Sequence, residues 1–348
     1  MFDPMSPELG SINAEGTPTE IGRTLGAAGR VAVEQVLLPS DYWKAVTGAQ
    51  HQTTVERISH HIQRLFPSIW EELEGLAEGL DLPLQQVVAW NCRGDLMTNV
   101  PDGCTTIQLP APVQGTSHVI AHNEDGIPEF RGHAFLLEAA PSEGPSFMSF
   151  CYPGSIPGHT FGVNAAGLVQ TINNLRLREV SPDLSRMVVG RAVLGCDSLQ
   201  SALDLLSEHN ASGGFHMTLA QAGDPRVMSI EFGADTCSIH PVTAPSAHAN
   251  HALHMTGALQ TQLVTASSRD RQARATQLLA EGVNDPLLIL RDNSGAGLPL
   301  HRTDPDDPDN ENTLATGVFH LSASAVEWSI YDQTSDRPVF TGRKDIRG

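Results

Sequence analysis

The sequence has few cysteines and few positive charges, and each shortage excludes a class of protein. Its five cysteines are odd in number and widely spaced, with no C-x-x-C pair, so neither a disulfide framework nor a thiolate zinc site is indicated. Lys and Arg together number 21 against 40 Asp and Glu, which gives a net charge of -19. This acidic balance argues against nucleic acid and anionic membranes as partners.

Long apolar runs are absent as well. Nowhere do about 18 uninterrupted apolar residues occur, the length that a membrane-spanning helix requires. Residues 1–5 lack the basic start and apolar core of a signal peptide, so we expect a cytoplasmic protein. The 348 residues, 40% of them hydrophobic, are enough for one large or two small domains with a sizeable core.

The first part of the chain predicts helices. Residues 1–20 are rich in Pro, Gly, Ser and Glu, which predicts a loosely held leader or an irregular lead-in. From Glu20 to Leu80 apolar residues recur at helical spacings in otherwise polar segments, which predicts about three amphipathic helices. A further helix is expected from Leu84, directly after Pro83.

Past Asn99 short apolar runs alternate with Pro and Gly clusters, as in an antiparallel sheet built from hairpins. Strands are expected over residues 105–109, 117–122, 134–139, 146–151, 160–163, 168–172, 216–221, 227–232, 237–241, 247–252, 313–322, 325–332 and 338–341. Helices are expected over residues 184–194, 198–208 and 267–281. This order of elements suits two sheets between helical layers, an α+β arrangement.

One cysteine has surroundings that suggest chemistry. Cys104 follows Gly103 at the start of an expected strand, so its thiol would lie at a sheet edge beside an unhindered carbonyl. The thiol could attack the Gly103 carbonyl, and hydrolysis of the resulting thioester would free the α-amino group of Cys104. That group has a reference pKa of about 7.7 to 8.0, near the value wanted of a general base at neutral pH. Nucleophile and base would then reside in one residue, although a buried structural thiol is the alternative interpretation.

Further polar segments could complete a site around this cysteine. The hairpin after Cys104 would return the segment A-H-N-E-D-G beside it, where a carboxylate, Glu124 or Asp125, could orient the new ammonium or the thiol; the run N-E-D-G is also an ordinary turn signal. Asn173, Asn174 or Asn250, each at an expected strand end, could aim an amide NH2 at a developing oxyanion, although asparagine also caps turns there.

The segment S-S-R-D-R-Q-A-R begins a predicted helix and offers a cation. Its serines suit a helix N-cap, and its arginines suit the surface. Functionally, one of these arginines could bind a carboxylate or support the nucleophile.

Two metal sites are conceivable but disfavoured. His248, His251 and His254 could bind zinc, but no carboxylate or cysteine stands at a suitable spacing, and 15 histidines make chance clusters common. The run Asp304–Asp309 could bind calcium, but proline interrupts the regular ligand spacing of an EF-hand loop. We therefore expect no metal.

Five signals, in this order along the chain, resemble those of the cysteine N-terminal-nucleophile (Ntn) hydrolases. They are G-C-T-T, N-x-D, G-x-N-x-x-G-L with a following Asn, H-x-N-H, and S-x-x-R-x-x-R. The resemblance is strongest to the penicillin acyltransferase-like branch, which includes the β-alanyl-dopamine and carcinine hydrolases. It implies a four-layer αββα sandwich, the Ntn hydrolase fold, that works without a metal or organic cofactor.

The resemblance also implies how the chain is divided and which residues act. Self-cleavage would fall between Gly103 and Cys104, giving a helical segment 1–103 and a catalytic segment 104–348 that form one composite domain, an α/β heterodimer. The roles carried over are Cys104 as nucleophile with its amine as base, Asp125 near that amine, Asn250 as oxyanion donor, Arg271 in preference to Arg269, and Asn173 or Asn174 as an auxiliary asparagine.

The implied activity is hydrolysis of a non-peptide N-acyl amide through a thioester on Cys104. The run Asn123-Glu124-Asp125 looks more like that of the β-alanyl-amine hydrolases than that of the penicillin enzyme, and an acidic protein suits an amine substrate. Two alternatives stay open: an acyl-CoA-dependent N-acyltransferase that uses the same thioester, and a non-catalytic or unprocessed relative that binds a small ligand or a partner. A homo-oligomer is also left open.

Overall fold

The computed structural model describes residues 9–98, 103–111, 117–178, 180–257 and 261–346, in which two β-sheets lie face to face. The larger sheet has the strand order β1-β4-β5-β6-β7-β8-β9-β10 and the smaller one β11-β2-β3-β12-β13-β14. Neighbouring strands are antiparallel except β1 and β4, which are parallel. The hairpin-built sheets expected from the sequence are therefore present.

The strands of the larger sheet are β1 (Gly10–Gly16), β4 (Phe135–Pro141), β5 (Phe147–Cys151), β6 (Phe161–Asn164), β7 (Leu168–Leu175), β8 (Gly214–Gln221), β9 (Val227–Gly233) and β10 (Thr236–Pro241). Those of the smaller sheet are β11 (Ser246–His248), β2 (Gly103–Leu109), β3 (His118–Gly126), β12 (Asn312–Leu321), β13 (Ala325–Asp332) and β14 (Phe340–Asp345). The α-helices are α1 (Pro18–Ala32), α2 (Asp41–Val46), α3 (Gln52–Leu65), α4 (Pro67–Leu80), α5 (Leu84–Trp90), α6 (Arg93–Leu96), α7 (Arg186–Leu194), α8 (Leu199–Glu208), α9 (Ala266–Ala280) and α10 (Pro286–Leu290).

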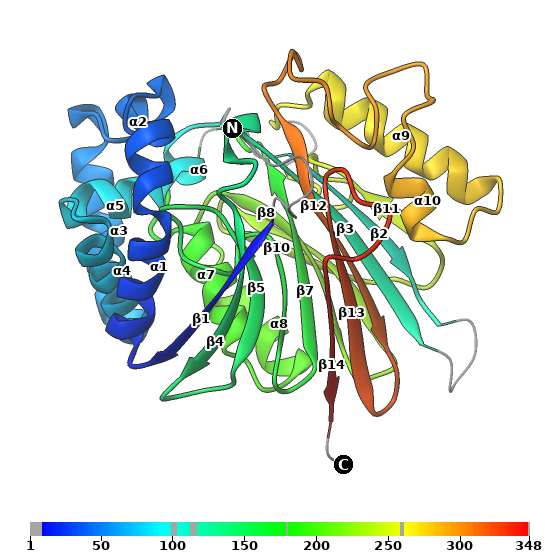
Figure 1. Cartoon of the computed structure of the whole chain (residues 1–348), viewed down its shortest axis with the longest axis horizontal. Coiled ribbons are helices and arrows are strands. Elements are labelled where there is room, and N and C mark those ends of the chain that lie inside the picture. Colours follow the sequence, from blue (N-terminus) through cyan, green and yellow to red (C-terminus); the bar gives the residue numbers. More distant parts are fainter. Residues whose placement is uncertain (1–8, 99–102, 112–116, 179, 258–260, 347–348) are drawn as a thin grey trace.

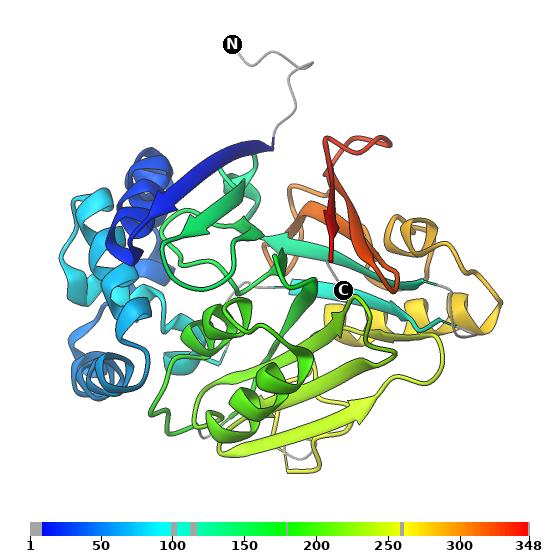
Figure 2. The same ribbon diagram turned by 90° about the horizontal axis from the view of Figure 1, so that it is seen from below.

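Helices cover the outer face of each sheet, which confirms the four-layer αββα sandwich (Figures 1 and 2). Helices α7 and α8 lie on the larger sheet, and α9 and α10 lie on the smaller one. The smaller sheet and its helices share a separate apolar cluster, in which Ile107 of β2 and Ala121 of β3 pack with Ala275 and Ile289. No helix in the described ranges is both long and apolar enough to cross a membrane.

The leader prediction was wrong for Gly10–Gly16, which forms β1 at the edge of the larger sheet, beside β4 (Figure 1). Residues 1–8 lie outside the described residues. Helix α1 then begins at a capping box, in which Thr17 and Glu20 bond each other's backbone N–H, with Pro18 in the first turn. The sequence therefore contained the signal for the start of α1. It contained no comparable signal for β1, a single strand at the edge of the sheet.

Helices α1 and α4 cross closely because glycines line their contact. A Cβ on Gly22 would lie 2.0 Å from the Glu72 carbonyl oxygen, and one on Gly75 would lie 2.1 Å from that of Thr19. Only a residue without a side chain permits this approach. The helices expected from Glu20 to Leu80 thus form one packed block at one side of the molecule (Figure 1).

The β2–β3 pair presents two distinct faces. Residues opposite each other share a face, and consecutive residues alternate. The inner face, between the sheets, carries Thr106, which bonds Asn173 of the larger sheet. The outer face, towards α9 and α10, carries Ile107 and Ala121. Hence residues 104, 122 and 124 belong to the inner face and residues 103 and 125 to the outer face.

Candidate active site

The backbone of β2 holds Cys104 at the junction that the sequence singles out. Cys104 lies opposite Glu124, and Gly103 lies opposite Asp125. The backbone N–H of Cys104 donates to Asn250 Oδ1 at 2.9 Å. The cysteine is buried, with 2% of its surface exposed, but it lies among polar groups. A purely structural thiol would be expected in apolar packing instead.

Arg271 contacts both the backbone of Cys104 and the side chain of Asn250. One guanidinium nitrogen donates to the Cys104 carbonyl oxygen and, at 2.7 Å, to Thr105 Oγ1. The other donates to Asn250 Oδ1 at 2.6 Å. Arg271 is fully buried, and burial lowers its pKa from the ordinary value. Its hydrogen bonds hold the guanidinium beside the backbone of Cys104, in the fork geometry that arginine allows.

The start of α9 explains why Arg271 and Asn250 meet. Thr265 caps the helix, which places Ser267 and Ser268 in its first turn. Ser267 Oγ accepts from Arg271 Nε at 3.0 Å, and Ser268 Oγ accepts from the Asn250 backbone N–H at 2.9 Å. The expected serine N-cap is therefore wrong: Ser267 and Ser268 lie inside the helix, where they orient Arg271 and Asn250. Arg269, the alternative arginine, is exposed.

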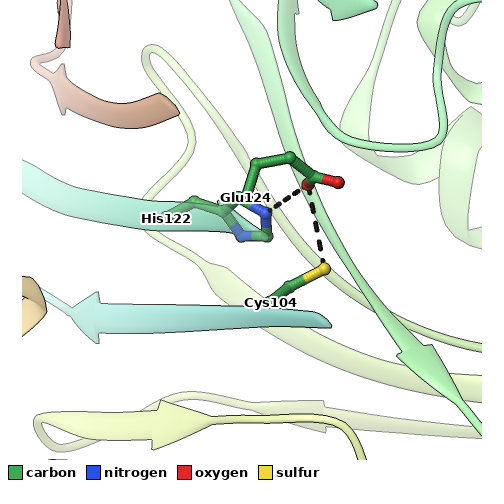
Figure 3. Close-up of side chains that lie close together, drawn as sticks. All are labelled: Cys104, His122 and Glu124. Carbon is green, nitrogen blue, oxygen red and sulfur yellow. Dashed lines mark hydrogen bonds and ion pairs between the residues drawn. The ribbon is translucent and has the colours of Figure 1, made fainter. Parts of the chain in front are cut away.

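On the inner face, Glu124 and His122 lie beside the thiol (Figure 3). Cys104 Sγ is 3.8 Å from Glu124 Oε2, and the same oxygen is 2.9 Å from His122 Nε2. The Tyr152 hydroxyl donates to Glu124 Oε1 at 2.7 Å. Burial, together with Arg271, lowers the pKa of His122 to about 3, so this imidazole is uncharged near neutral pH.

Asn173 extends this network towards the larger sheet. Its Oδ1 accepts from the Thr106 hydroxyl at 2.8 Å and contacts His216 Nδ1 at 3.0 Å. Its Nδ2 donates to the His248 carbonyl oxygen at 3.1 Å. Thr106 Oγ1 in turn contacts His122 Nδ1 at 2.8 Å. The polar contacts therefore run without a break from the thiol to β7 and β8.

Asn174, the alternative auxiliary asparagine, is bound differently. Its backbone oxygen accepts from Asn250 Nδ2 at 3.2 Å, and its side-chain oxygen accepts from Arg186. Its buried Nδ2 has no hydrogen-bond partner in the part of the chain that the structure describes. Both asparagines thus adjoin the site, one through Thr106 and the other through Asn250.

The outer face around Gly103 is charged. Asp125 Oδ1 accepts from the Thr313 hydroxyl at 2.6 Å, while its buried Oδ2 has no hydrogen-bond partner among the described residues. A Cβ on Gly103 would lie 2.3 Å from Glu311 Oε2 and 3.2 Å from the Asp125 Cβ. Glu311 pairs with Arg302. Burial raises the pKa of Asp125, against the opposite effect of Arg271 and Arg302.

One group of side chains has the composition of a metal site. The ligand atoms of Cys104, His122 and Glu124 lie within 4.8 Å of one another, and a thiolate, an imidazole and a carboxylate are groups that zinc binds. The histidines weighed from the sequence are engaged elsewhere: His248 bonds Glu231 at 2.8 Å and His251 contacts Ser268 at 2.7 Å.

The acidic loop considered for calcium is paired with an arginine instead. Arg302 binds the carboxylates of Asp307 and Asp309. Arg302 thus offsets part of the negative charge of this loop.

The sequence predicted no role for His122 or Tyr152, and Glu124 was only one of two carboxylates expected in the returning hairpin. A signal for two of them was present: in a strand, residues 122 and 124 share a face, so H-N-E-D alternates between two faces. Reading N-E-D-G as a turn hid this alternation, because β3 continues to Gly126. Tyr152 follows β5, and no local pattern connects it to Glu124.

A narrow cavity adjoins the inner face at Tyr152. It is lined by Tyr42, Trp90, Arg93, Gly126, Ile127, Phe130 and Tyr152. Three of the lining residues precede the Gly103–Cys104 junction in the sequence, and the other four follow it. The cavity is one contact away from Glu124, through the Tyr152 hydroxyl.

Comparison with known families gives a match over most of the chain. The family model described as acyl-coenzyme A:6-aminopenicillanic acid acyl-transferase matches residues 113–334, which is more than half of the 348 residues. The matched segment includes Asp125, Asn173, Asn250 and Arg271. Cys104 lies nine residues before it.

Two curated relatives are similar to the chain. A β-alanyl-dopamine/carcinine hydrolase of Drosophila melanogaster is 27% identical over 327 residues, covering 79% of this chain and 78% of the relative. The 40 kDa form of acyl-coenzyme A:6-aminopenicillanic-acid acyltransferase of Emericella nidulans is 23% identical over 184 residues, covering 49% of this chain and 48% of the relative.

Two solved structures are also similar. A mutant conjugated bile acid hydrolase from Clostridium perfringens has a TM-score of 0.46 and 12% identity, with 70% of this chain and 92% of that chain covered. A penicillin V acylase from Agrobacterium tumefaciens has a TM-score of 0.37 and 16% identity, with 67% and 87% covered.

Proposed function

The chain belongs to the acyl-coenzyme A:6-aminopenicillanic acid acyl-transferase family, and from this premise we propose that it is a self-processing hydrolase of non-peptide amides. One observation carries the proposal. The backbone N–H of Cys104 is bound by a side chain, Asn250, and Arg271 bridges that side chain and the Cys104 carbonyl oxygen. A strand that served only the fold would give these backbone groups to a neighbouring strand.

The proposed self-cleavage converts this arrangement into an active site. The thiol of Cys104 attacks the Gly103 carbonyl, and water then hydrolyses the thioester. The freed amine would stay at the position that Asn250 Oδ1 and Arg271 now define. Departure of Gly103 would also open the space beside Asp125, since the two residues are opposite each other and share the outer face.

In turnover, the same sulfur would act on an amide substrate. The Cys104 thiolate attacks the acyl carbon with the α-amine as base, and Asn250 with backbone N–H groups stabilises the oxyanion. The amine leaves and water hydrolyses the thioester. In this proposal Asp125 orients the Cys104 amine, and Asn173 supports the inner face through Thr106.

We propose a β-alanyl amine as the substrate. The Drosophila relative, which covers 79% of this chain, is named for hydrolysis of β-alanyl-dopamine and carcinine. A net charge of -19 would attract a substrate that carries an ammonium group. A cytoplasmic location, expected from the sequence, belongs to the same proposal.

The two fragments would stay together as a heterodimer. Residues 1–103 contribute β1 to the larger sheet, where it pairs with β4 over seven residues. Asn91 Oδ1 accepts from the Ile156 backbone N–H at 2.9 Å, and Asp95 Oδ1 accepts from that of Gly213 at 2.7 Å. These buried contacts cross the proposed division of the chain.

Acyl transfer is the second candidate. The family description and the Emericella relative both name an acyl-coenzyme A acyltransferase. The same thioester would serve, with an amine in place of water as the acceptor. The choice depends on whether water or an amine reaches the thioester first.

Hydrolysis by the purified protein tests the proposal. We expect release of β-alanine from β-alanyl-dopamine or carcinine by the wild type and none by Cys104→Ala. Addition of a second amine distinguishes the candidates: a hydrolase keeps releasing free β-alanine, whereas an acyltransferase forms the new amide. Absence of both products across an amide library would contradict the proposed function.

A further inference from the structure

The hydrogen bonds of the inner face determine where its protons lie. The backbone carbonyl of His248 can only accept, so the Asn173 side chain must turn Nδ2 towards it and Oδ1 towards Thr106. Amide oxygen carries no hydrogen. The Thr106 hydroxyl must therefore donate to Asn173 across the 2.8 Å between them.

The same reasoning extends to His122. Thr106 has given its one hydrogen to Asn173, so its contact of 2.8 Å with His122 Nδ1 requires a hydrogen on Nδ1. An uncharged imidazole with hydrogen on Nδ1 has a lone pair on Nε2. That Nε2 lies 2.9 Å from Glu124 Oε2, a distance that also requires a shared proton. One extra proton therefore lies between His122 and Glu124: either the imidazole is charged and faces a carboxylate, or it is uncharged and faces a protonated carboxyl group.

The environment decides which partner carries this proton. Both side chains are fully buried, and burial lowers the pKa of His122 to about 3, so the imidazole is uncharged before the reaction begins. Glu124 then carries the proton and donates it to Nε2. Its other oxygen accepts from Tyr152, and the oxygen that faces His122 also faces Cys104 Sγ at 3.8 Å.

Self-cleavage needs a base that turnover does not. In the precursor the nitrogen of Cys104 is still part of a peptide bond, so it cannot take a proton from the thiol. We propose that Glu124, positioned by His122, is the catalytic residue that deprotonates Cys104 during self-cleavage. This inference rests on the proposed function and assigns it two successive bases: Glu124 before cleavage and the amine afterwards.

The proposed step balances in protons and bonds. The S–H proton passes to Glu124 Oε2 as the proton already on Glu124 passes to His122 Nε2, so the imidazole is charged only until the Cys104 nitrogen takes a proton back. The sulfur forms a bond to the Gly103 carbonyl carbon, and the bond from that carbon to the Cys104 nitrogen breaks. The nitrogen takes a proton back from the pair as it leaves. Glu124 and His122 end with the single proton that they held at the start.

Glu124→Gln is the matched test, because a glutamine amide reproduces the hydrogen bonds without the acid. Its NH2 can donate to His122 Nε2 and its oxygen can accept from Tyr152, but it cannot exchange a proton with sulfur. We expect processing, followed by mass spectrometry of the intact chain and its fragments, to slow by about 10²- to 10⁴-fold, the usual effect of general acid–base catalysis. An unchanged thermal unfolding midpoint would confirm that the variant folds.

Tyr152→Phe is the control on the same carboxyl group. It removes the hydrogen bond to Oε1 but keeps the Oε2 contact with sulfur, so processing should slow by less than about tenfold, the cost of one hydrogen bond. In the processed fraction of Glu124→Gln, turnover should fall by less than processing does, since the amine is then present.

The outcomes separate this inference from the proposed function. If the wild type cleaves and Glu124→Gln cleaves at the same rate, the inference fails and the proposed function stands. Equal losses in processing and turnover would also contradict it, because Glu124 would then not be specific to the precursor. If the wild type itself stays intact and inactive, both proposals fail.

Discussion

The two faces of the β2–β3 pair differ in the charge of their side chains. The inner face beside the Cys104 thiol holds His122 uncharged and links it to Glu124 through a shared proton. The outer face beside Gly103 contains the ion pair of Arg302 with Glu311 and, nearby, the buried Asp125 carboxyl group. The junction of Gly103 and Cys104 lies between them. One face is suited to moving a proton, and the other to holding an ammonium and an oxyanion in place.

Apart from Cys104 and Glu124, the largest loss is expected at Arg271. Arg271→Lys keeps the charge but replaces the fork that reaches both the Cys104 carbonyl and Asn250 with a single ammonium. Loss of one such preorganised donor costs about 10²- to 10³-fold in rate. Fragment formation and amide hydrolysis should both fall by this amount.

Arg269→Lys is the matched control, two residues away on the same helix and exposed. It should leave both rates close to the wild type. Equal effects of the two substitutions would remove the distinction between a buried positioning group and a surface charge.

Asp125 provides a test of the outer face. Asp125→Asn keeps the bond from Thr313 but removes the carboxylate that would hold the ammonium of processed Cys104. We expect turnover to fall by about 10- to 10²-fold, the value of one or two charge-assisted hydrogen bonds. Processing should fall less, because no ammonium exists in the precursor. The ratio of the two rates is the measurement, and a larger loss in processing would contradict the assignment.

Acid should destabilise the region behind the inner face. Burial, with Arg93, lowers the pKa of His159 to about 3, and its ring packs 5.4 Å from that of Tyr152. The unfolded value is about 6.5, so the uncharged form favours the folded state above that pH, and the advantage is lost as pH falls towards 3. This group alone contributes a slope of up to about 1.4 kcal/mol per pH unit.

Denaturant unfolding between pH 7 and pH 4 measures this slope. His159→Gln should reduce it, whereas the same change at exposed His320 should not. A slope that is identical in the two variants would mean that His159 titrates alike in the folded and unfolded chains.

The smallest effect is expected at Thr106. Thr106→Val removes the hydroxyl that sets the hydrogen on His122 Nδ1, whereas Thr106→Ser keeps it. One neutral hydrogen bond contributes about 1 kcal/mol, so processing of the valine variant should slow several-fold relative to the serine variant. Equal rates would indicate that Thr106 does not position the imidazole.

The sequence predicted most of the fold because the periodic elements are long or repeated. Strand β5 is buried along its whole length, and its mostly apolar run stood out between Gly and Pro clusters. The missed elements are short or lie at an edge: β1, α10 and the π-helical turn at Val33–Leu37. Strand β11 also differs from the prediction: it ends at His248, whereas the sequence predicted a strand over residues 247–252.

The site was predicted in part for a related reason. Gly103–Cys104 and the arginine segment are local motifs, and the structure brings Cys104, Asn250 and Arg271 together. The partners of the thiol depend instead on strand register. A shift of one residue between β2 and β3 would replace Glu124 by Asn123 or Asp125 opposite Cys104. No spacing in the sequence determines that register.

The most direct test of self-processing is the mass of the purified wild-type protein together with N-terminal sequencing of its fragments. We predict two associated chains that divide between Gly103 and Cys104, with cysteine at the new N-terminus, and a single uncut chain for Cys104→Ala. A wild-type protein that stays intact at neutral pH, or that divides at another bond, would contradict the account.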